Sequence, residues 1–228
     1  MFDRISYKKT AKQMLKGHWK IPVLITLFIL LISTLSSIPS FANQESFSLI
    51  AFLGSILTVI IAGILEIAAV CFYLEFTNKN SETKFNYFLE SLNRWKDGIL
   101  GVLWTYLWTF LWSLLLFIPG IIKSYSYKMI FFILAENPGI SVRKAMNMSK
   151  AMTKGFKWDL FVMDLSFIGW GILSLLTLGI GLLWLEPYIR TSTVYAYKYL
   201  KERVIASGVL TEADFSANKI EEVNGSND

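Results

Sequence analysis

Charged residues inside long apolar stretches have the greatest capacity for chemistry in this sequence. Glu66, Glu186, Arg190 and Lys128 each lie in such a stretch, and Lys123 lies five residues before Lys128. If these stretches are in a bilayer, a charge near its centre costs at least ~2.5 kcal/mol and usually has a partner or a function. We therefore treat the first four residues as a candidate intramembrane polar cluster.

Two interpretations of this cluster fit the sequence. Glu186 and Arg190 stand four residues apart, with Glu on the favoured N-terminal side of a helical ion pair. Pro187 lies between them, and a proline-broken helix beside charges is also typical of transporter sites. A guanidinium that bonds Glu186 can also reach Glu66 on a neighbouring helix, which leaves one excess negative charge for a proton or Lys128 to offset.

The residue types that hydrolases and metalloenzymes require are scarce. His18 is the only histidine and Cys71 the only cysteine, so the sequence offers no catalytic triad, no thiolate cluster and no internal disulfide. Gly169-Trp170-Gly171 and Gly179-Ile180-Gly181 are too short for a phosphate-binding loop. We expect no catalytic residue, no metal and no cofactor. His18, beside Trp19, is expected to contact lipid headgroups.

The composition indicates a membrane protein. Apolar residues make up 54% of the 228 residues and charged residues 17%, whereas soluble domains carry roughly 25% charged residues. The net charge of +5 does not indicate nucleic acid, because the basic residues lie in short stretches between apolar runs, where the positive-inside rule expects them. We therefore expect an all-α, polytopic transmembrane helical bundle.

About six spans are predicted from the apolar runs, given that ~20 residues cross a bilayer. Asp159 and Asp164 fall in the first turns of the fifth run, where a carboxylate is tolerated. The first run could also be read as a secretory signal with Ser40-Phe41-Ala42 as its cleavage site, but an uncleaved span fits better because further spans follow. The runs are Ile21 to Ile38, Phe47 to Phe76, Ile99 to Ile118, Ile121 to Ala135, Trp158 to Leu178, and Ile180 to about Leu200.

The distribution of Lys and Arg predicts the orientation. Residues 1–20 carry six, 78–97 four, 138–157 five and the segment from Lys198 onward four, while the loops at 39–46 and around Gly179 carry none. All four basic segments are expected on the cytoplasmic side of a bacterial cell membrane, with both termini inside. This requires an even number of crossings between them, so the weak run from 121 to 135 is predicted to cross, with Pro119-Gly120 as the turn.

Each basic segment is also amphipathic and precedes a two-span hairpin, which indicates three units of one design, 1–77, 78–137 and 138–203, followed by a polar acidic tail, 204–228. Such helices are expected in the membrane interface against an anionic inner leaflet. The interfacial basic residues are expected to be Lys12, Lys16, Lys150 and Lys154. The apolar stripes are Tyr7, Ala11, Met14, Leu15 and His18; Phe85, Phe88, Leu89, Leu92 and Trp95; and Val142, Ala145, Met146, Ser149, Met152 and Phe156.

Several motifs in the C-terminal half resemble the family called domain of unknown function 975 (DUF975), uncharacterised bacterial integral membrane proteins with six spans. The resemblance covers nearly the whole chain and is strongest from Ile118 to Tyr199. It supports the six-span architecture and implies no activity, substrate or catalytic residue. The motifs are Ile118-Pro119-Gly120-Ile121, Ser149-Lys150-Ala151-Met152-Thr153-Lys154-Gly155, Ser166-Phe167-Ile168-Gly169-Trp170, Thr177-Leu178-Gly179-Ile180-Gly181-Leu182-Leu183-Trp184 and Pro187-Tyr188.

The leading functional hypothesis is a non-enzymatic scaffold or accessory protein, held on the inner leaflet by its basic amphipathic helices, that can also dock a protein partner. The alternative is a small transporter or export component with a polar site around Glu66, Glu186 and Arg190. A lipid enzyme ranks third, because no nucleophile and base are paired in the sequence. A water-accessible cavity at Glu66 would favour transport, and a packed core with all three charges paired would favour the scaffold.

Overall fold

The computed structural model describes residues 2–41, 49–79, 83–115 and 117–215. Within these residues it contains helices and no strands, which confirms the all-α prediction. Of the predicted tail, residues 216–228 lie outside the described residues. The elements are α1 (Arg4–Leu15), α2 (Lys20–Phe41), α3 (Leu49–Asn78), α4 (Phe85–Ser91), η1 (Leu92–Arg94), α5 (Trp95–Leu115), α6 (Phe117–Tyr127), α7 (Ile130–Glu136), α8 (Val142–Thr153), α9 (Lys157–Leu176), α10 (Leu182–Ala206) and η2 (Glu212–Phe215).

Five of the six predicted apolar runs correspond to single helices, namely α2, α3, α5, α9 and α10. The remaining run, from 121 to 135, was predicted as one span, and the structure shows that it is not one continuous helix. The chain turns at Lys128 and Met129 and divides the run into α6 and α7. The 11 residues of α6 reach only about 16 Å at 1.5 Å per residue, roughly half of the hydrocarbon thickness. Neither piece is long enough to cross.

Pro119 and Gly120 were predicted to form the turn before this run, but they lie inside the first turn of α6. Proline is accepted there because the first N–H groups of a helix have no intrahelical partner. Residue 116, where α5 gives way to α6, lies outside the described residues.

Two helices are long and apolar enough to cross a membrane among the described residues: the part of α3 from Phe52 to Asn78, and α9. A third candidate arises if α1 and α2 are taken as one bent span, although their axes differ by 101°. These helices are compatible with a membrane protein, and they are fewer than the six crossings predicted from the apolar runs.

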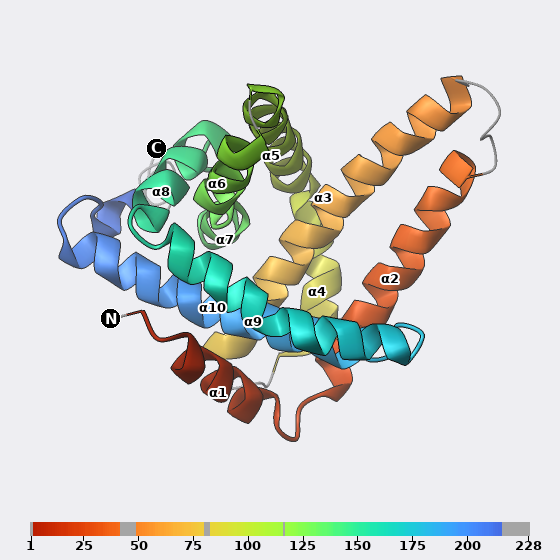
Figure 1. Ribbon diagram of the computed structural model, residues 1–228, viewed down its shortest axis with the longest axis horizontal. Helices are drawn as coiled ribbons and strands as arrows, with labels where there is room; N and C mark the ends of the chain where they lie inside the picture. Colours follow the sequence, from red (N-terminus) through yellow and green to blue (C-terminus); the bar gives the residue numbers. More distant parts are fainter. Residues whose placement is uncertain (1, 42–48, 80–82, 116, 216–228) are drawn as a thin grey trace, which may run out of the picture.

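The core of the molecule is formed by the C-terminal halves of α3 and α10 together with α7 and α8 (Figure 1). Residues 67–74 of α3 are buried on every side, as expected for a helix that is apolar all round. Phe132 of α7 stacks on Tyr197 of α10 with ring centroids 5.1 Å apart. This packing joins segments from all three predicted units into one body.

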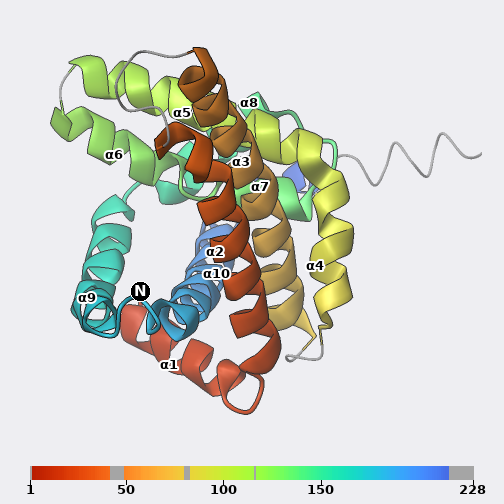
Figure 2. The same cartoon turned by 90° about the vertical axis from the view of Figure 1, so that its right-hand side faces the viewer.

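Three hairpins, α2–α3, α5–α6 and α9–α10, extend from this core in different directions (Figures 1 and 2). Their far ends carry exposed leucines: Leu35 is 61% exposed, Leu114 74% and Leu178 94%. The hairpins therefore do not pack as one bundle of parallel spans. Their roots are fixed by the buried core, whereas their tips have few protein neighbours to align them.

The third hairpin lies alongside α1. The ammonium of Lys8 on α1 donates to the Ser166 hydroxyl on α9 at 3.1 Å, and the rings of Phe2 and Tyr199 of α10 are 5.8 Å apart. Because α1 itself stands at 101° to α2, α9 and α10 run across the first hairpin. Helices that cross in this way cannot all stand perpendicular to one bilayer.

The second and third hairpins are closed by the same contact. Gly120 of α6 faces Ser113 of α5, and Gly181 at the start of α10 faces Ser174 of α9, so both glycines follow their serine by seven residues. A Cβ on Gly120 would lie 3.0 Å from the Ser113 Cα, and one on Gly181 would lie 2.9 Å from the Ser174 Cα. Only glycine allows these helices to approach so closely.

The apolar stripes of the amphipathic helices pack mainly on protein, which corrects the expectation that they face lipid. On α1, Ala11 and Leu15 are fully buried. On α8, Ala145, Ser149 and Met152 are buried, because α6, α7 and α10 pack against this helix. The stripe beginning in α4 is divided between the core and the surface. Apolar area that is already removed from water by protein cannot also anchor the chain in a bilayer.

Candidate functional site

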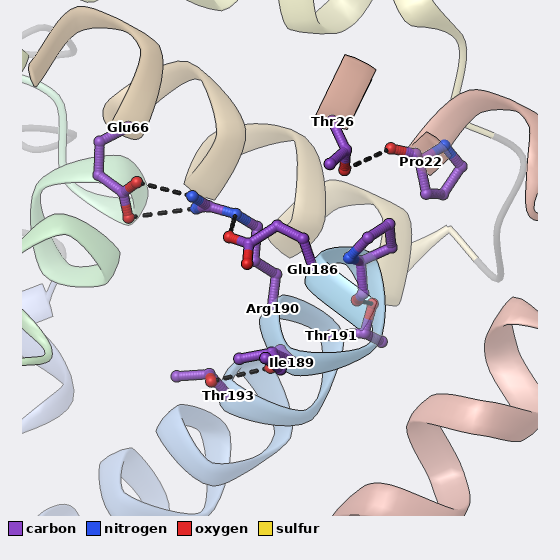
Figure 3. A network of polar contacts seen from close by, with 9 residues as sticks. Pro22, Thr26, Glu66, Glu186, Ile189, Arg190, Thr191 and Thr193 are labelled. Atoms are coloured by element: carbon purple, nitrogen blue, oxygen red, sulfur yellow. Dashed lines mark hydrogen bonds and ion pairs between the residues drawn. The ribbon is translucent and has the colours of Figure 1, made fainter. Parts of the chain in front are cut away.

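Three of the four predicted polar residues lie where α10 passes α3 (Figure 3). Glu66 stands near the middle of α3, and Glu186 and Arg190 stand one turn apart near the start of α10. Pro187 is the sixth residue of α10, where its missing N–H leaves the Leu183 carbonyl without its usual helical donor. The α-helix nevertheless continues through it, so Glu186 and Arg190 remain on one face.

Arg190 joins the two carboxylates. Its Nη2 and Nη1 donate to the two carboxylate oxygens of Glu66 at 2.9 and 3.2 Å, and its Nε donates to Glu186 at 2.8 Å. The planar guanidinium thus forms a two-pronged contact across helices and a second contact along its own helix. The structure brings together these three residues of the cluster expected from the sequence.

The three side chains differ in exposure. The Arg190 side chain is 19% exposed, whereas those of Glu66 and Glu186 are 37% and 39% exposed. One cation between two carboxylates leaves a formal charge of −1, which a single proton can neutralise. The ion pairs can hold α3 and α10 together, and the two carboxylates are also accessible from outside the protein.

Lys128 was expected to share this cluster, and the structure places it in another ion pair. Its ammonium bonds both oxygens of Asp164 on α9 at 2.5 Å, and the Tyr125 hydroxyl donates to the same carboxylate at 3.0 Å. Asp164 lies in the second turn of α9, where the sequence alone explained it as a tolerated end-of-helix carboxylate. Lys123 stands over the ring of Trp112 at 4.2 Å. The second and third hairpins are therefore joined by their own ion pair.

The four predicted interfacial lysines, Lys12, Lys16, Lys150 and Lys154, form no ion pair with any described residue. Lys8, which was not singled out in the sequence, is instead held against α9, with its ammonium 4.3 Å from the centre of the Phe167 ring. Burial, and secondarily the neighbouring Arg4, lowers the pKa of Lys8. The basic surface of α1 thus combines one engaged lysine with several unpaired ones.

Two further polar contacts were not found from the sequence. Arg94, just before α5, donates to the Ala135 carbonyl at 2.6 Å, to the Leu134 carbonyl, and to Asp97 at 2.9 Å. It thereby satisfies carbonyls at the end of α7 that have no helical donor. The Asp97 spacing of three residues was visible in the sequence, whereas nothing local indicated the contacts 40 residues away.

Glu136 is the last residue of α7 and contacts α10. It accepts hydrogen bonds from the Tyr197 hydroxyl at 2.7 Å and from Lys201 at 2.5 Å, both on α10. The short, buried α7 is therefore tied by charged groups both to the start of α5 and to the end of α10.

No group of three or more His, Cys, Asp and Glu side chains that could hold a metal ion occurs in the described part of the chain. Comparison with curated proteins and with solved structures gave no match. The model of one family, described as "Protein of unknown function (DUF975)", matches residues 1–126 and 102–204. Residues 102–126 fall in both matches. The chain belongs to this family of proteins of unknown function.

Proposed function

We propose that this chain is a non-enzymatic integral protein of the bacterial cytoplasmic membrane with a scaffold or accessory role. The exposed apolar tips of the three hairpins are the observation that carries the proposal. Leu35, Leu114 and Leu178 are 61%, 74% and 94% exposed, and each would lose roughly 1.5 to 3 kcal/mol if left in water instead of being buried in hydrocarbon. A bilayer removes that cost for all three tips.

The same packing suggests how the chain sits in the membrane. The first hairpin crosses, because α3 has 30 residues and α2 has 22. The second and third hairpins enter the inner leaflet and return, since α6 is too short to cross and α9–α10 lies beside the basic helix α1. If every basic segment lies on the cytoplasmic side, the number of crossings between two of them must be even. A hairpin that enters and returns makes no crossing, so both termini remain cytoplasmic. Six full crossings would satisfy the same parity.

The ion pairs favour a scaffold. Arg190 is paired with Glu66 and Glu186, and Lys128 with Asp164, so these charges within apolar helices are satisfied inside the protein. A conduction site would instead need a charge that exchanges its partner for a substrate. In this proposal the charges fix the crossing of α3 and α10 and join the second hairpin to the third, and the basic helices face the anionic leaflet.

Alkaline carbonate extraction of membranes from cells that produce the full chain tests the membrane location. We expect the chain to remain in the membrane pellet, as an integral protein does, and not in the supernatant with peripheral proteins. A soluble His-tagged marker and a known integral protein serve as the two controls. Release of the chain by carbonate would refute the integral-membrane proposal.

A transporter is the second candidate, favoured by one observation: the Glu66 and Glu186 side chains are more than a third exposed. A carboxylate that is reachable from outside can exchange protons. Proton flux into vesicles that contain the purified chain, driven by a potassium diffusion potential and followed with a pH-sensitive dye, separates the two functions. The scaffold predicts the flux of empty vesicles, whereas flux that is lost in Glu66→Gln would establish the transporter.

A further inference from the structure

A cavity of about 490 Å³ lies between the end of α1 and the tip of the third hairpin. Its volume falls in the range of roughly 300 to 1,000 Å³ that is usual for small-molecule sites. Figures 1 and 2 show that α1 runs beside the α9–α10 hairpin and that the chain then turns away into α2. The residues that line the cavity are Lys12, Trp19, Trp170, Leu173, Ser174, Thr177, Gly181, Trp184, Leu185 and Tyr188.

The walls of this cavity are effectively apolar. Three tryptophans, Tyr188 and two leucines provide most of the lining. The Ser174 and Thr177 hydroxyls are already used within the hairpin turn, because Ser174 donates to the Trp170 carbonyl at 2.8 Å and Thr177 donates to the Ser174 carbonyl at 2.8 Å. Aromatic and aliphatic walls of this kind suit a hydrocarbon chain, and tryptophan is the residue most typical of headgroup depth.

The charge at the cavity is positive and unopposed. Lys12 is the one charged residue among the lining residues, and it forms no ion pair with a described residue. Lys9 and Lys16, also exposed, lie within about a turn of it on α1. The acidic residue of this segment, Asp3, is at the far end of α1, where its carboxylate accepts from the Ile5 and Ser6 N–H groups.

We propose that this cavity binds one anionic phospholipid of the inner leaflet, with an acyl chain between the aromatic walls and the phosphate at Lys12. The inference rests on the proposed membrane location and names the partner that the basic helix α1 recognises there. A zwitterionic lipid offers Lys12 less net negative charge, and its cationic headgroup finds no carboxylate in the lining. An apolar peptide would leave Lys12 without a partner.

Native mass spectrometry of the full chain, purified in detergent and titrated with phosphatidylglycerol or phosphatidylcholine of the same acyl chains, tests the site. We expect one phosphatidylglycerol to be retained in preference to phosphatidylcholine. Lys12→Gln should weaken the retention of phosphatidylglycerol roughly fivefold, the effect of one lysine near an anionic headgroup. Lys84→Gln, an equal change of charge at an exposed lysine just before α4 and outside the lining, should leave that retention unchanged.

A second pair of variants tests the apolar part of the cavity. Leu173→Trp adds a ring to the wall and should lower the retention of both lipids, whereas Leu165→Trp changes a similarly exposed leucine of α9 outside the lining and should not. Equal retention of the two lipids, equal effects of the two lysine variants, or a co-purifying peptide in place of lipid would each overturn the site. Any of these results in a carbonate-resistant protein would leave the membrane location intact, so the two proposals fail separately.

Discussion

Arg190 of α10 holds Glu66 of α3 through two hydrogen bonds of 2.9 and 3.2 Å, although the two residues are 124 positions apart in the sequence. This contact fixes where the two long helices cross, because a guanidinium and a carboxylate meet in two-pronged fashion only when both are coplanar and correctly spaced. Glu186 completes the arrangement from the same helix as Arg190.

Removing the cation of this cluster should destabilise the protein. Arg190→Leu leaves two neighbouring carboxylates without a partner and should cost about 3 kcal/mol, the lower end of the effect for buried pairs because the carboxylates are partly exposed. The midpoint of thermal unfolding in detergent should fall, and adding Glu66→Gln should restore part of the loss. Arg203→Leu on the same helix, at an exposed arginine without an ion pair among the described residues, should change little. Strictly additive losses would exclude direct coupling of Arg190 and Glu66.

The break between α6 and α7 should depend on Ser149 of α8. Its hydroxyl accepts from the Met129 N–H at 3.2 Å and donates to the Ser126 carbonyl at 2.8 Å, which satisfies two backbone groups near the break. Ser149→Ala should lower the free energy of unfolding by about 1 to 3 kcal/mol, the cost of buried polar groups without partners. Ser124→Ala, at an exposed serine that bonds only within its own helix, is the control, and an equal effect of both variants would contradict this role.

Arg94 should control the local stability of α7. Arg94→Met removes the charged donor from the Ala135 and Leu134 carbonyls and should cost about 2 kcal/mol, as for other hydrogen bonds to a charged group. In this variant, hydrogen exchange followed by mass spectrometry should become faster in peptides from α7 and stay the same in peptides from α2. Lys96→Met changes an exposed cation that stands 5.5 Å from the Trp95 ring, and it should leave the exchange of α7 unaltered. Unchanged exchange in both variants would show that Arg94 is not needed there.

The depth of the third hairpin can be measured with thiol labelling. Leu178→Cys places a thiol at the most exposed position of the hairpin tip, while the native Cys71 is buried. A returning hairpin, whose tip lies in hydrocarbon, predicts no reaction with a membrane-impermeant maleimide in intact cells or in inverted vesicles, and reaction after solubilisation. Asn43→Cys, in the loop predicted outside from the charge distribution, should react from outside. Labelling of position 178 from outside would instead show that the third hairpin crosses the membrane.

The sequence determined the features that depend on neighbours along the chain. Apolar runs of helical length, the spacing of Glu186 and Arg190 and the amphipathic patterns of α1 and α8 each follow from a helical repeat of 3.6 residues, so they could be predicted without a fold. The family assignment also followed from short sequence motifs, and the family model confirms it.

The tertiary structure decided which distant groups meet. Charge and hydropathy could not predict the partner of Lys128. The packing of α6 against α9 pairs it with Asp164 rather than with Glu66. The run from 121 to 135 is apolar enough to resemble a span, and it breaks where Ser149 of α8 bonds two backbone groups beside the break. The directions of the hairpins likewise follow from how their roots share one core, since side-chain packing between segments far apart in sequence is not encoded in any local period.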